Sequence, residues 1–211
     1  MTFSIAARDA RTGALGVATA TAGPAVGALV PHGRANAAAV ATQAMTNPYI
    51  AIDLLANVEQ NGAQSALDLA LAADPESDRR QVIVVDAEGG IAVWTGGSCQ
   101  GYAGHRTGKD LAVAGNILAG PSVLDAMLDA ASSTLEMPEK LLAALKAGHA
   151  AGGDSRGINS AALKVYGSQA YPDVDLRIDW SADPLADLAD LMQRTLTGGY
   201  AEFFAQVMRR G

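Results

Sequence analysis

The sequence is poor in cysteine and aromatic residues, and its basic residues form no cluster. Cys99 is the only cysteine among 211 residues, which excludes an internal disulfide and a zinc site built on a CxxC pair. Lys and Arg number 15 against 22 Asp and Glu, a formal net charge of −7, so a nucleic-acid partner or an anionic membrane surface is not expected. The partner predicted instead is a small molecule.

Long apolar runs are also missing. No run approaches the roughly 18 residues of a membrane span, and no basic and apolar leader precedes the first strand. We therefore predict a cytoplasmic protein that does not engage a membrane.

The chain does have the composition of one globular domain. Hydrophobic residues make up 49% of it and charged residues 18%, which is enough to bury a sizeable core. It shows no internal repeat, low-complexity linker or break in composition. We predict a single domain over residues 1–211.

Alternating patterns predict a series of strands, several of them joined by Gly-containing turns. The predicted strands are 3–8, 14–21, 36–44, 80–85, 91–95, 111–117, 159–166 and 174–180. Pro31 to Gly33 reads as a turn, and a glycine-rich loop precedes the strand at 111–117.

Helical spacing appears between these strand blocks. The predicted helices are 48–62, 63–73, 121–132 and 138–147, with an amphipathic tail over 183–210 that is interrupted at Gly198 and Gly199. Strand blocks that alternate with helix pairs indicate an α+β protein with sheets covered by helices. Inward Ala residues such as Ala18, Ala20, Ala39 and Ala41 would let two sheets approach closely. The predicted fold is a four-layer α-β-β-α sandwich of two mainly antiparallel sheets.

Thr2 opens the first predicted strand and has two interpretations. Threonine favours strands, so a structural role is the ordinary one. If Met1 is removed, however, Thr2 gains an α-amine with a pKa of about 7.7 to 8.0, and that amine could accept the proton of its own hydroxyl. Thr2 is therefore our candidate nucleophile.

A series of motifs along nearly the whole chain resembles the family known as domain of unknown function 1028, which is grouped with the N-terminal nucleophile (Ntn) hydrolases. The motifs lie at residues 2–5, 7–9, 12–13, 24–27, 30–31, 34, 40–44, 46–47, 104–105, 115–116, 118–120, 152–154, 156–157, 160–163, 171–172 and 174–177. The resemblance implies an α-β-β-α fold and hydrolysis of an amide bond as the default chemistry. It does not specify a substrate.

Several polar residues are candidates for the rest of a site. Asn116, between Gly115 and an apolar residue, could donate an amide N–H to an oxyanion, or it could cap a turn. Asp154 and Arg156, in a glycine-containing loop, could orient a substrate or the terminal amine, or form a salt-bridged turn. Ser160 lies in the family motif at residues 160–163, and we predict on that basis that it binds substrate.

Three further substrate-binding candidates come from the region of the third predicted strand. Gln43 and Asn47 lie on either side of the strand's end, where side chains could line a pocket. Arg34 could pair with an acidic substrate or lower the pKa of the amine, or be a surface residue. His32 and His105 lack a second ligand at a suitable spacing, so no metal and no cofactor is predicted.

The sequence leaves alternatives open. The leading hypothesis is hydrolysis of a small or cyclic amide by Thr2. A non-catalytic ligand-binding or assembly module on the same fold is the second, and an enzyme that uses Cys99 with His105 as base is the third. An apolar stripe of Tyr200, Phe203, Phe204 and Val207 also predicts a homo-oligomer.

Overall fold

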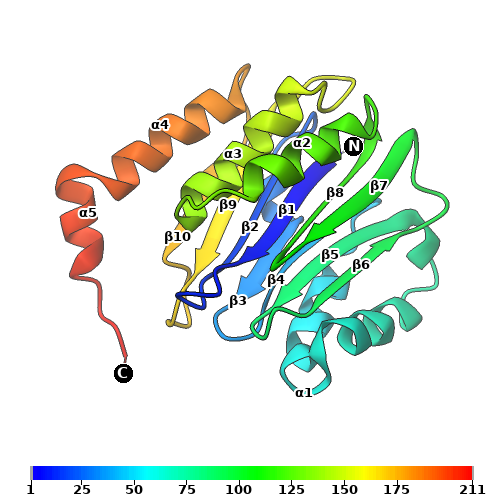
Figure 1. The fold of residues 1–211 in the computed structure, drawn as a ribbon, viewed down its shortest axis with the longest axis horizontal. Coiled ribbons are helices and arrows are strands. Elements are labelled where there is room, and N and C mark those ends of the chain that lie inside the picture. The colour runs from blue at the N-terminus through cyan, green and yellow to red at the C-terminus, as the bar shows by residue number, and fades with distance from the viewer. Residues whose placement is uncertain (1, 211) are drawn as a thin grey trace.

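A computed structural model describes residues 2–210 of the protein and shows two antiparallel sheets between layers of helices (Figure 1). The larger sheet has the strand order β10-β9-β2-β1-β8-β7, and the smaller has the order β3-β4-β5-β6. The strands of the larger sheet are β1 (Thr2–Arg8), β2 (Leu15–Thr21), β7 (Tyr102–Gly108), β8 (Leu111–Leu118), β9 (Ser160–Tyr166) and β10 (Val174–Ile178). Those of the smaller are β3 (Pro31–Arg34), β4 (Ala38–Ala44), β5 (Arg80–Asp86) and β6 (Ile91–Thr95).

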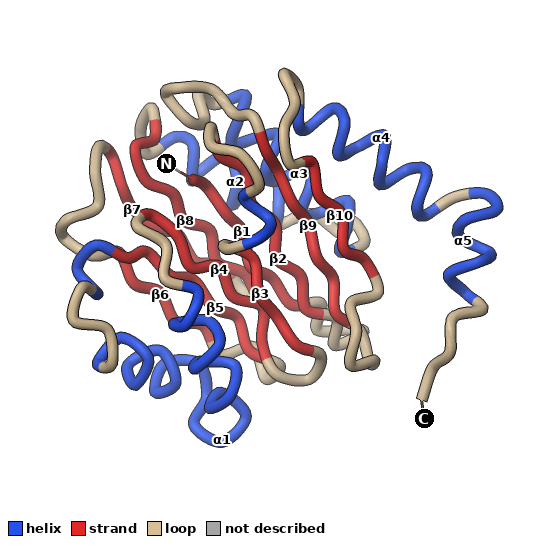
Figure 2. The backbone as a smooth tube through the Cα atoms, turned by 180° about the vertical axis from the view of Figure 1, so that it is seen from behind, coloured by secondary structure: helices blue, strands red, loops and turns tan. Residues whose placement is uncertain are grey.

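The helices occupy the two outer layers, as seen from both sides in Figures 1 and 2. They are α1 (Pro48–Ala72), α2 (Ser122–Ala131), α3 (Met137–Ala150), α4 (Pro184–Leu196) and α5 (Gly198–Ala205), with short 3-10 turns at Val26–Ala28 and Ser77–Arg79. Helix α1 covers the smaller sheet, and α2 and α3 cover the larger one. The predicted four-layer α-β-β-α sandwich is confirmed.

Side-chain alternation along each strand separates three apolar layers. In β1, Phe3, Ile5 and Ala7 pack under α2 and α3, whereas Ala6 faces the smaller sheet. Ala39 and Ala41 also lie between the sheets, as expected. Ala18 and Ala20, in contrast, belong to the layer under the helices, so only part of the small-residue pattern serves the close approach of the two sheets.

Most predicted elements are present, and the two that the sequence did not indicate are both edge strands. β3 was expected to be a turn and β7 a loop. An edge strand pairs on one side only, so it tolerates Pro31 at its first residue and the glycines of β7. The helices expected at 48–62 and 63–73 form one assigned element with a break at Gly62, where φ is 71°.

Helix α4 packs beside the β10 edge and buries Leu185 and Leu188 in the core under the helices, whereas α5 extends away from the body of the molecule (Figure 1). Helix α5 has no buried residue, and Tyr200 and Phe203 are among the exposed aromatic side chains. The predicted homo-oligomer stays a prediction. Over residues 2–210, no helix combines the length and apolar character that crossing a membrane requires.

Candidate active site

Thr2 begins β1 at the interior of the larger sheet. It lies in register between Thr21 of β2 and Asn116 of β8, and its Oγ1 is 3.3 Å from Oγ1 of Thr21. Thr2 and Ala6 are four residues apart in the same strand, so their side chains point to the same face. The Thr2 side chain therefore faces the layer between the sheets. Only 6% of Thr2 is exposed. The ladders on both sides therefore hold this hydroxyl at one end of the inter-sheet layer.

Three buried side-chain amides lie beneath Thr2 and form what we call the amide cluster: Gln43, Gln81 and Asn116. Gln81 Oε1 accepts hydrogen bonds from Gln43 Nε2 at 2.8 Å and from Asn116 Nδ2 at 3.0 Å. The same two nitrogens reach the carbonyl oxygen of Thr2 at longer distances, 3.4 and 3.5 Å. The cluster thus connects both sheets to the backbone of the candidate nucleophile.

The orientation of the cluster is fixed by Gln81. Its Nε2 donates to the backbone oxygens of Gly104 at 3.0 Å and Gly115 at 2.9 Å. Carbonyl oxygens only accept, so the Gln81 amide cannot be reversed, and Asn116 must present its nitrogen to Gln81 Oε1. One N–H of Asn116 is committed to this bond. Within residues 2–210, the other N–H has only the long contact to Thr2, and it is the one that a substrate oxygen could take over.

Asp154 lies in line with the N-terminal end of β1. It forms an isolated β-bridge with Leu118 of β8, and its Oδ2 accepts from the N–H of Ala22, just after β2, at 3.2 Å. On its other side Leu118 pairs with Tyr102. Because β1 lies between β2 and β8, Asp154 occupies the space just beyond Thr2, where its carboxylate could orient a free α-ammonium group.

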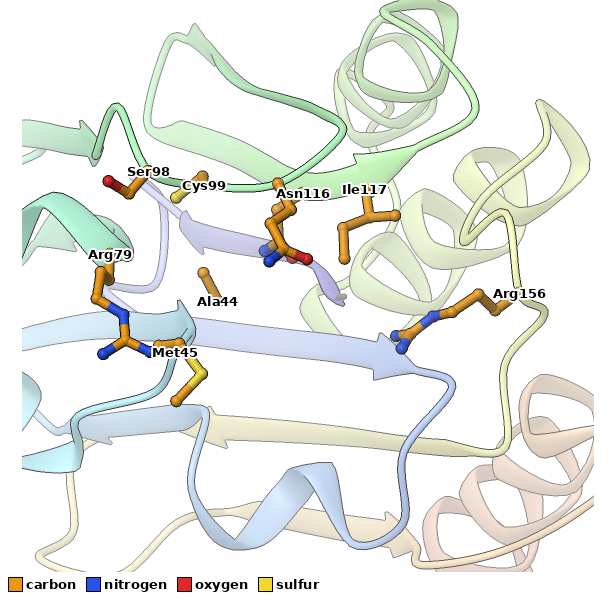
Figure 3. A pocket seen from close by; sticks show the side chains of 9 residues that line it. Ala44, Met45, Arg79, Ser98, Cys99, Asn116, Ile117 and Arg156 are labelled. Carbon is orange, nitrogen blue, oxygen red and sulfur yellow. The ribbon is translucent and has the colours of Figure 1, made fainter.

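A cavity of about 270 Å³ opens beside Asn116 (Figure 3). Ser98, Cys99 and Gln100 form one wall, and Met45, Arg79 and Arg156 contribute further side chains. The remaining lining residues are Asn116, Ala44 and Ile117. Of the predicted site residues, the cavity therefore contains Asn116 and Arg156, with Thr2 on the neighbouring strand.

Two residues that line this cavity have strained backbone conformations. Among residues 2–210, five non-glycine residues have left-handed φ angles, and two of them, Ala44 at 70° and Ile117 at 52°, line the cavity. Such a conformation is most unusual for a β-branched residue. Gly101 makes it feasible, since a Cβ there would lie 2.8 Å from the Ile117 Cα. Strain of about 1–3 kcal/mol per residue is typical of functional sites.

Two of the predicted substrate-binding residues lie elsewhere. Arg34 is the last residue of β3 and pairs with Ala38, at the end of β4 that is remote from Gln43. It forms an exposed ion pair with Glu59 at 3.1 Å. Ser160 is fully buried, and its hydroxyl donates to the Gly23 carbonyl at 2.7 Å. Neither lines the cavity, so their expected contact with substrate finds no support in the geometry.

Cys99 lines the cavity, but it is not paired with His105. The Cys99 thiol contacts the backbone oxygen of Arg80 at 3.5 Å, and burial raises the pKa of the thiol. Nδ1 of His105 instead lies 3.1 Å from Thr95 Oγ1, and burial lowers the pKa of the imidazole. A thiol with a raised pKa is less ionised and a weaker nucleophile at neutral pH.

Nowhere in residues 2–210 do three or more His, Cys, Asp or Glu side chains converge to hold a metal ion.

Asn47, the remaining candidate, belongs to a buried polar cluster behind the cavity wall. Its Oδ1 accepts from the N–H of Tyr49 and caps α1, and its Nδ2 donates to Asp74 at 2.9 Å. Asp74 also pairs with Arg80 at 2.8 Å, and Arg80 in turn donates to the carbonyl of Met45 at 2.7 Å. Asn47 therefore has a structural role: it supports Asp74 and Arg80 behind the cavity wall and does not line the cavity itself.

The Asp74–Arg80 ion pair gives a pH-dependent prediction. The hydrogen bond from Arg80 holds the pKa of Asp74 well below its usual range, despite the opposing effect of burial. Asp74→Asn is expected to lower the free energy of unfolding at pH 7 by about 3 kcal/mol. The pair's contribution is present above the unfolded pKa of about 3.9 and is lost as pH falls toward the lower folded value, so this deficit shrinks below about pH 4.

Urea unfolding at pH 7 and pH 3 measures this effect. Asp190→Asn is the matched control, because the Asp190–Arg194 pair is exposed and should contribute at most about 0.5 kcal/mol. An Asp74→Asn deficit that is equally large at both pH values would contradict the assignment.

Sequence reasoning missed several residues around the site. Gln81 carries the same signal as Gln43, a carboxamide at an inward position of an apolar strand, and this signal could have identified it. Arg79, Ser98 and Gln100 had no local signal, because they lie in turns and loops that only the tertiary fold brings together.

Comparisons with known proteins give one clear assignment. The crystal structure of protein SPO2555 from Silicibacter pomeroyi, also a DUF1028 protein, is 36% identical, with a TM-score of 0.92 over 98% of this chain and 91% of that one. Anbu (ancestral beta-subunit) from Yersinia bercovieri is 10% identical, with a TM-score of 0.44 and 99% of both chains covered. A selenomethionine-labelled Anbu mutant from Hyphomicrobium sp. strain MC1 is 13% identical, with a TM-score of 0.44 and complete coverage of both chains.

No curated protein matches the chain. The family model of DUF1028, a family of unknown function, matches residues 2–188. The chain therefore belongs to the DUF1028 family.

Proposed function

We propose that this protein is an Ntn-type amidohydrolase that cleaves an amide bond of a small molecule through Thr2. The observation that carries the proposal is the placement of Thr2 at the start of an interior strand, between Asn116 and Thr21. Asp154 lies just beyond its backbone nitrogen, and a cavity opens beside Asn116. Thr2 is connected to this cavity through Asn116, its partner on β8, and this connection supports the proposal.

The reaction needs a free Thr2 amine, and hence the removal of Met1. The amine accepts the hydroxyl proton while Oγ1 attacks the amide carbon, and Asn116 Nδ2 stabilises the oxyanion. The C–N bond breaks, the leaving nitrogen takes the proton, and an ester to Thr2 remains. Water, deprotonated by the same amine, then attacks the ester, releases a carboxylic acid and restores the hydroxyl.

Two forms of the protein test this proposal. A cleavable N-terminal fusion gives a chain that begins at Thr2, and the matched control retains Met1, with intact mass verifying both. We expect amide hydrolysis only from the Thr2-terminated form, because in the control the nitrogen is part of a peptide bond and cannot act as a base. Equal turnover by both forms in a screen of small amides would refute the mechanism.

A further inference from the structure

The cavity beside Asn116 has a cationic lining in an acidic protein. Arg79 and Arg156 are the only charged residues among the described residues that line it, although the whole chain has a net charge of −7. Their side chains are 45% and 52% exposed. Figure 3 shows them at opposite ends of the cavity, with Arg156 extending toward Asn116 and Ile117. A small anion in this space would lie between two guanidinium groups.

Arg156 is the better placed of the two for recognition, because it extends toward Asn116, the strand partner of Thr2. Its Nε and Nη2 lie 3.5 and 3.4 Å from the Asp154 carboxylate, both long contacts. Asp154 is bound more closely by backbone N–H groups, those of Arg156 at 2.7 Å and Ala22 at 3.2 Å. A guanidinium has five N–H donors. Asp154 therefore anchors the base of the loop and leaves Arg156 with donors for a ligand.

The acidic residues near Arg79 are likewise engaged. Arg79 pairs with the exposed Glu76. Asp78 lies behind the lining and accepts from the N–H of Gly97 at 2.8 Å and the hydroxyl of Ser98 at 2.7 Å. Asp78 thus holds the loop that carries Ser98 and Cys99, and neither Glu76 nor Asp78 lines the cavity.

From this arrangement we infer that the substrate is a small amide bearing a carboxylate, and that Arg156 binds this carboxylate with Arg79 as a second cation on the far side. The cavity suits a small molecule, and its lining offers Ser98, Gln100 and Asn116 as neutral hydrogen-bonding groups but no aromatic ring to stack on. An N-acylated amino acid has the required chemistry. Its carboxylate lies close to its amide, as Arg156 shares the cavity with Asn116, the strand partner of Thr2. An arginine fork matches a carboxylate in a bidentate manner. The assignment of this anion as a substrate rests on the proposed function, whereas its binding does not.

Binding is measured on the Thr2→Ala protein, so that no turnover is needed. The probes are N-acetylglycine, N-acetylalanine and N-acetylaspartate, each compared with its neutral methylamide, and the readout is the NMR signal of the Arg156 Nε–H during titration. We expect the acids to shift this signal and the methylamides to bind at least about tenfold more weakly, as is typical for the loss of a charge-assisted hydrogen bond.

Two substitutions locate the effect. Arg156→Gln should weaken binding of the acid probes at least about tenfold, and Arg156→Lys should restore part of it. Arg34→Gln is the matched control and should bind as the parent does, because Arg34 is an exposed arginine remote from the cavity. Thermal unfolding of each variant shows whether the fold is retained.

Equal binding of acids and methylamides, unchanged binding by a folded Arg156→Gln protein, or no binding of any acid at millimolar concentration would overturn the inference. Carboxylate binding that depends on Arg156, in a protein whose Thr2-terminated form hydrolyses none of the probes or other amides, would leave the anion site standing and refute the proposed function.

Discussion

Replacing Thr2 by Ala is expected to lower the rate of amide hydrolysis by on the order of 10⁴-fold or more, because the substitution removes the attacking oxygen. Thr2→Ser should retain activity, since it keeps both the hydroxyl and the α-amine and loses only the β-branch that restricts χ1. Both variants are prepared with residue 2 at the N-terminus and assayed on the substrate identified by the screen.

The fold should survive the Thr2→Ala substitution. Among the described residues, the Thr2 hydroxyl bonds to the side chain of Thr21 at 3.3 Å, whereas its backbone is held by strands on both sides. We expect thermal unfolding to change by no more than a few degrees, consistent with roughly 1 kcal/mol. A folded Thr2→Ala protein with undiminished activity would exclude Thr2 as the nucleophile.

Replacing Gln81 by Leu is expected to have the largest effect on stability, about 3 kcal/mol or more. Its Nε2 donates to two backbone oxygens and to Thr95, and its Oε1 accepts from two other amides. A leucine of similar size would remove all of these hydrogen bonds from the amide cluster, and a buried polar group that loses its partner costs about 1–3 kcal/mol. Urea unfolding measures the loss.

Gln64→Leu is the matched control for Gln81→Leu, because Gln64 lies exposed on α1 and, within residues 2–210, its side chain bonds only to Asp68. Its effect should be within about 0.5 kcal/mol. Gln81→Glu provides a second test, since it preserves size but replaces the donor that faces Gly104 and Gly115 with an acceptor. A Gln81→Glu protein as stable as the parent would show that the amide cluster is not the structural element described here.

The central elements of the fold were predictable from sequence because burial imposes strong periodicity on them. The strand at 111–117 alternates Leu111 and Val113 with Ala112 and Ala114, and these pairs face different layers. The edge strands β3 and β7 were not predicted. Each pairs with a neighbouring strand on one side only, so its sequence is less restricted to an alternating apolar pattern. The periodicity of a sequence reflects which side chains are buried. It therefore predicts a strand only where one or both faces of that strand are buried.

The candidate site was predictable in part, for a similar reason. Thr2, Gln43 and Asn116 are polar residues at inward strand positions, and the structure brings them together. Asn47 and Ser160 are also polar residues at element ends, but their hydrogen bonds serve a helix cap and a loop. Polar residues that build a site and those that cap an element look alike in sequence, and only the three-dimensional contacts distinguish them.

Covalent trapping tests the central claim most directly. The Thr2-terminated protein is treated with an electrophilic acylating probe, such as a β-lactone, and the adduct is located by mass spectrometry of the digested protein. We predict one adduct on the peptide that begins at Thr2, and none on that peptide in the Met1-bearing control. An adduct on the peptide that contains Cys99, with the N-terminal peptide unmodified, would contradict the account and identify the thiol as the nucleophile.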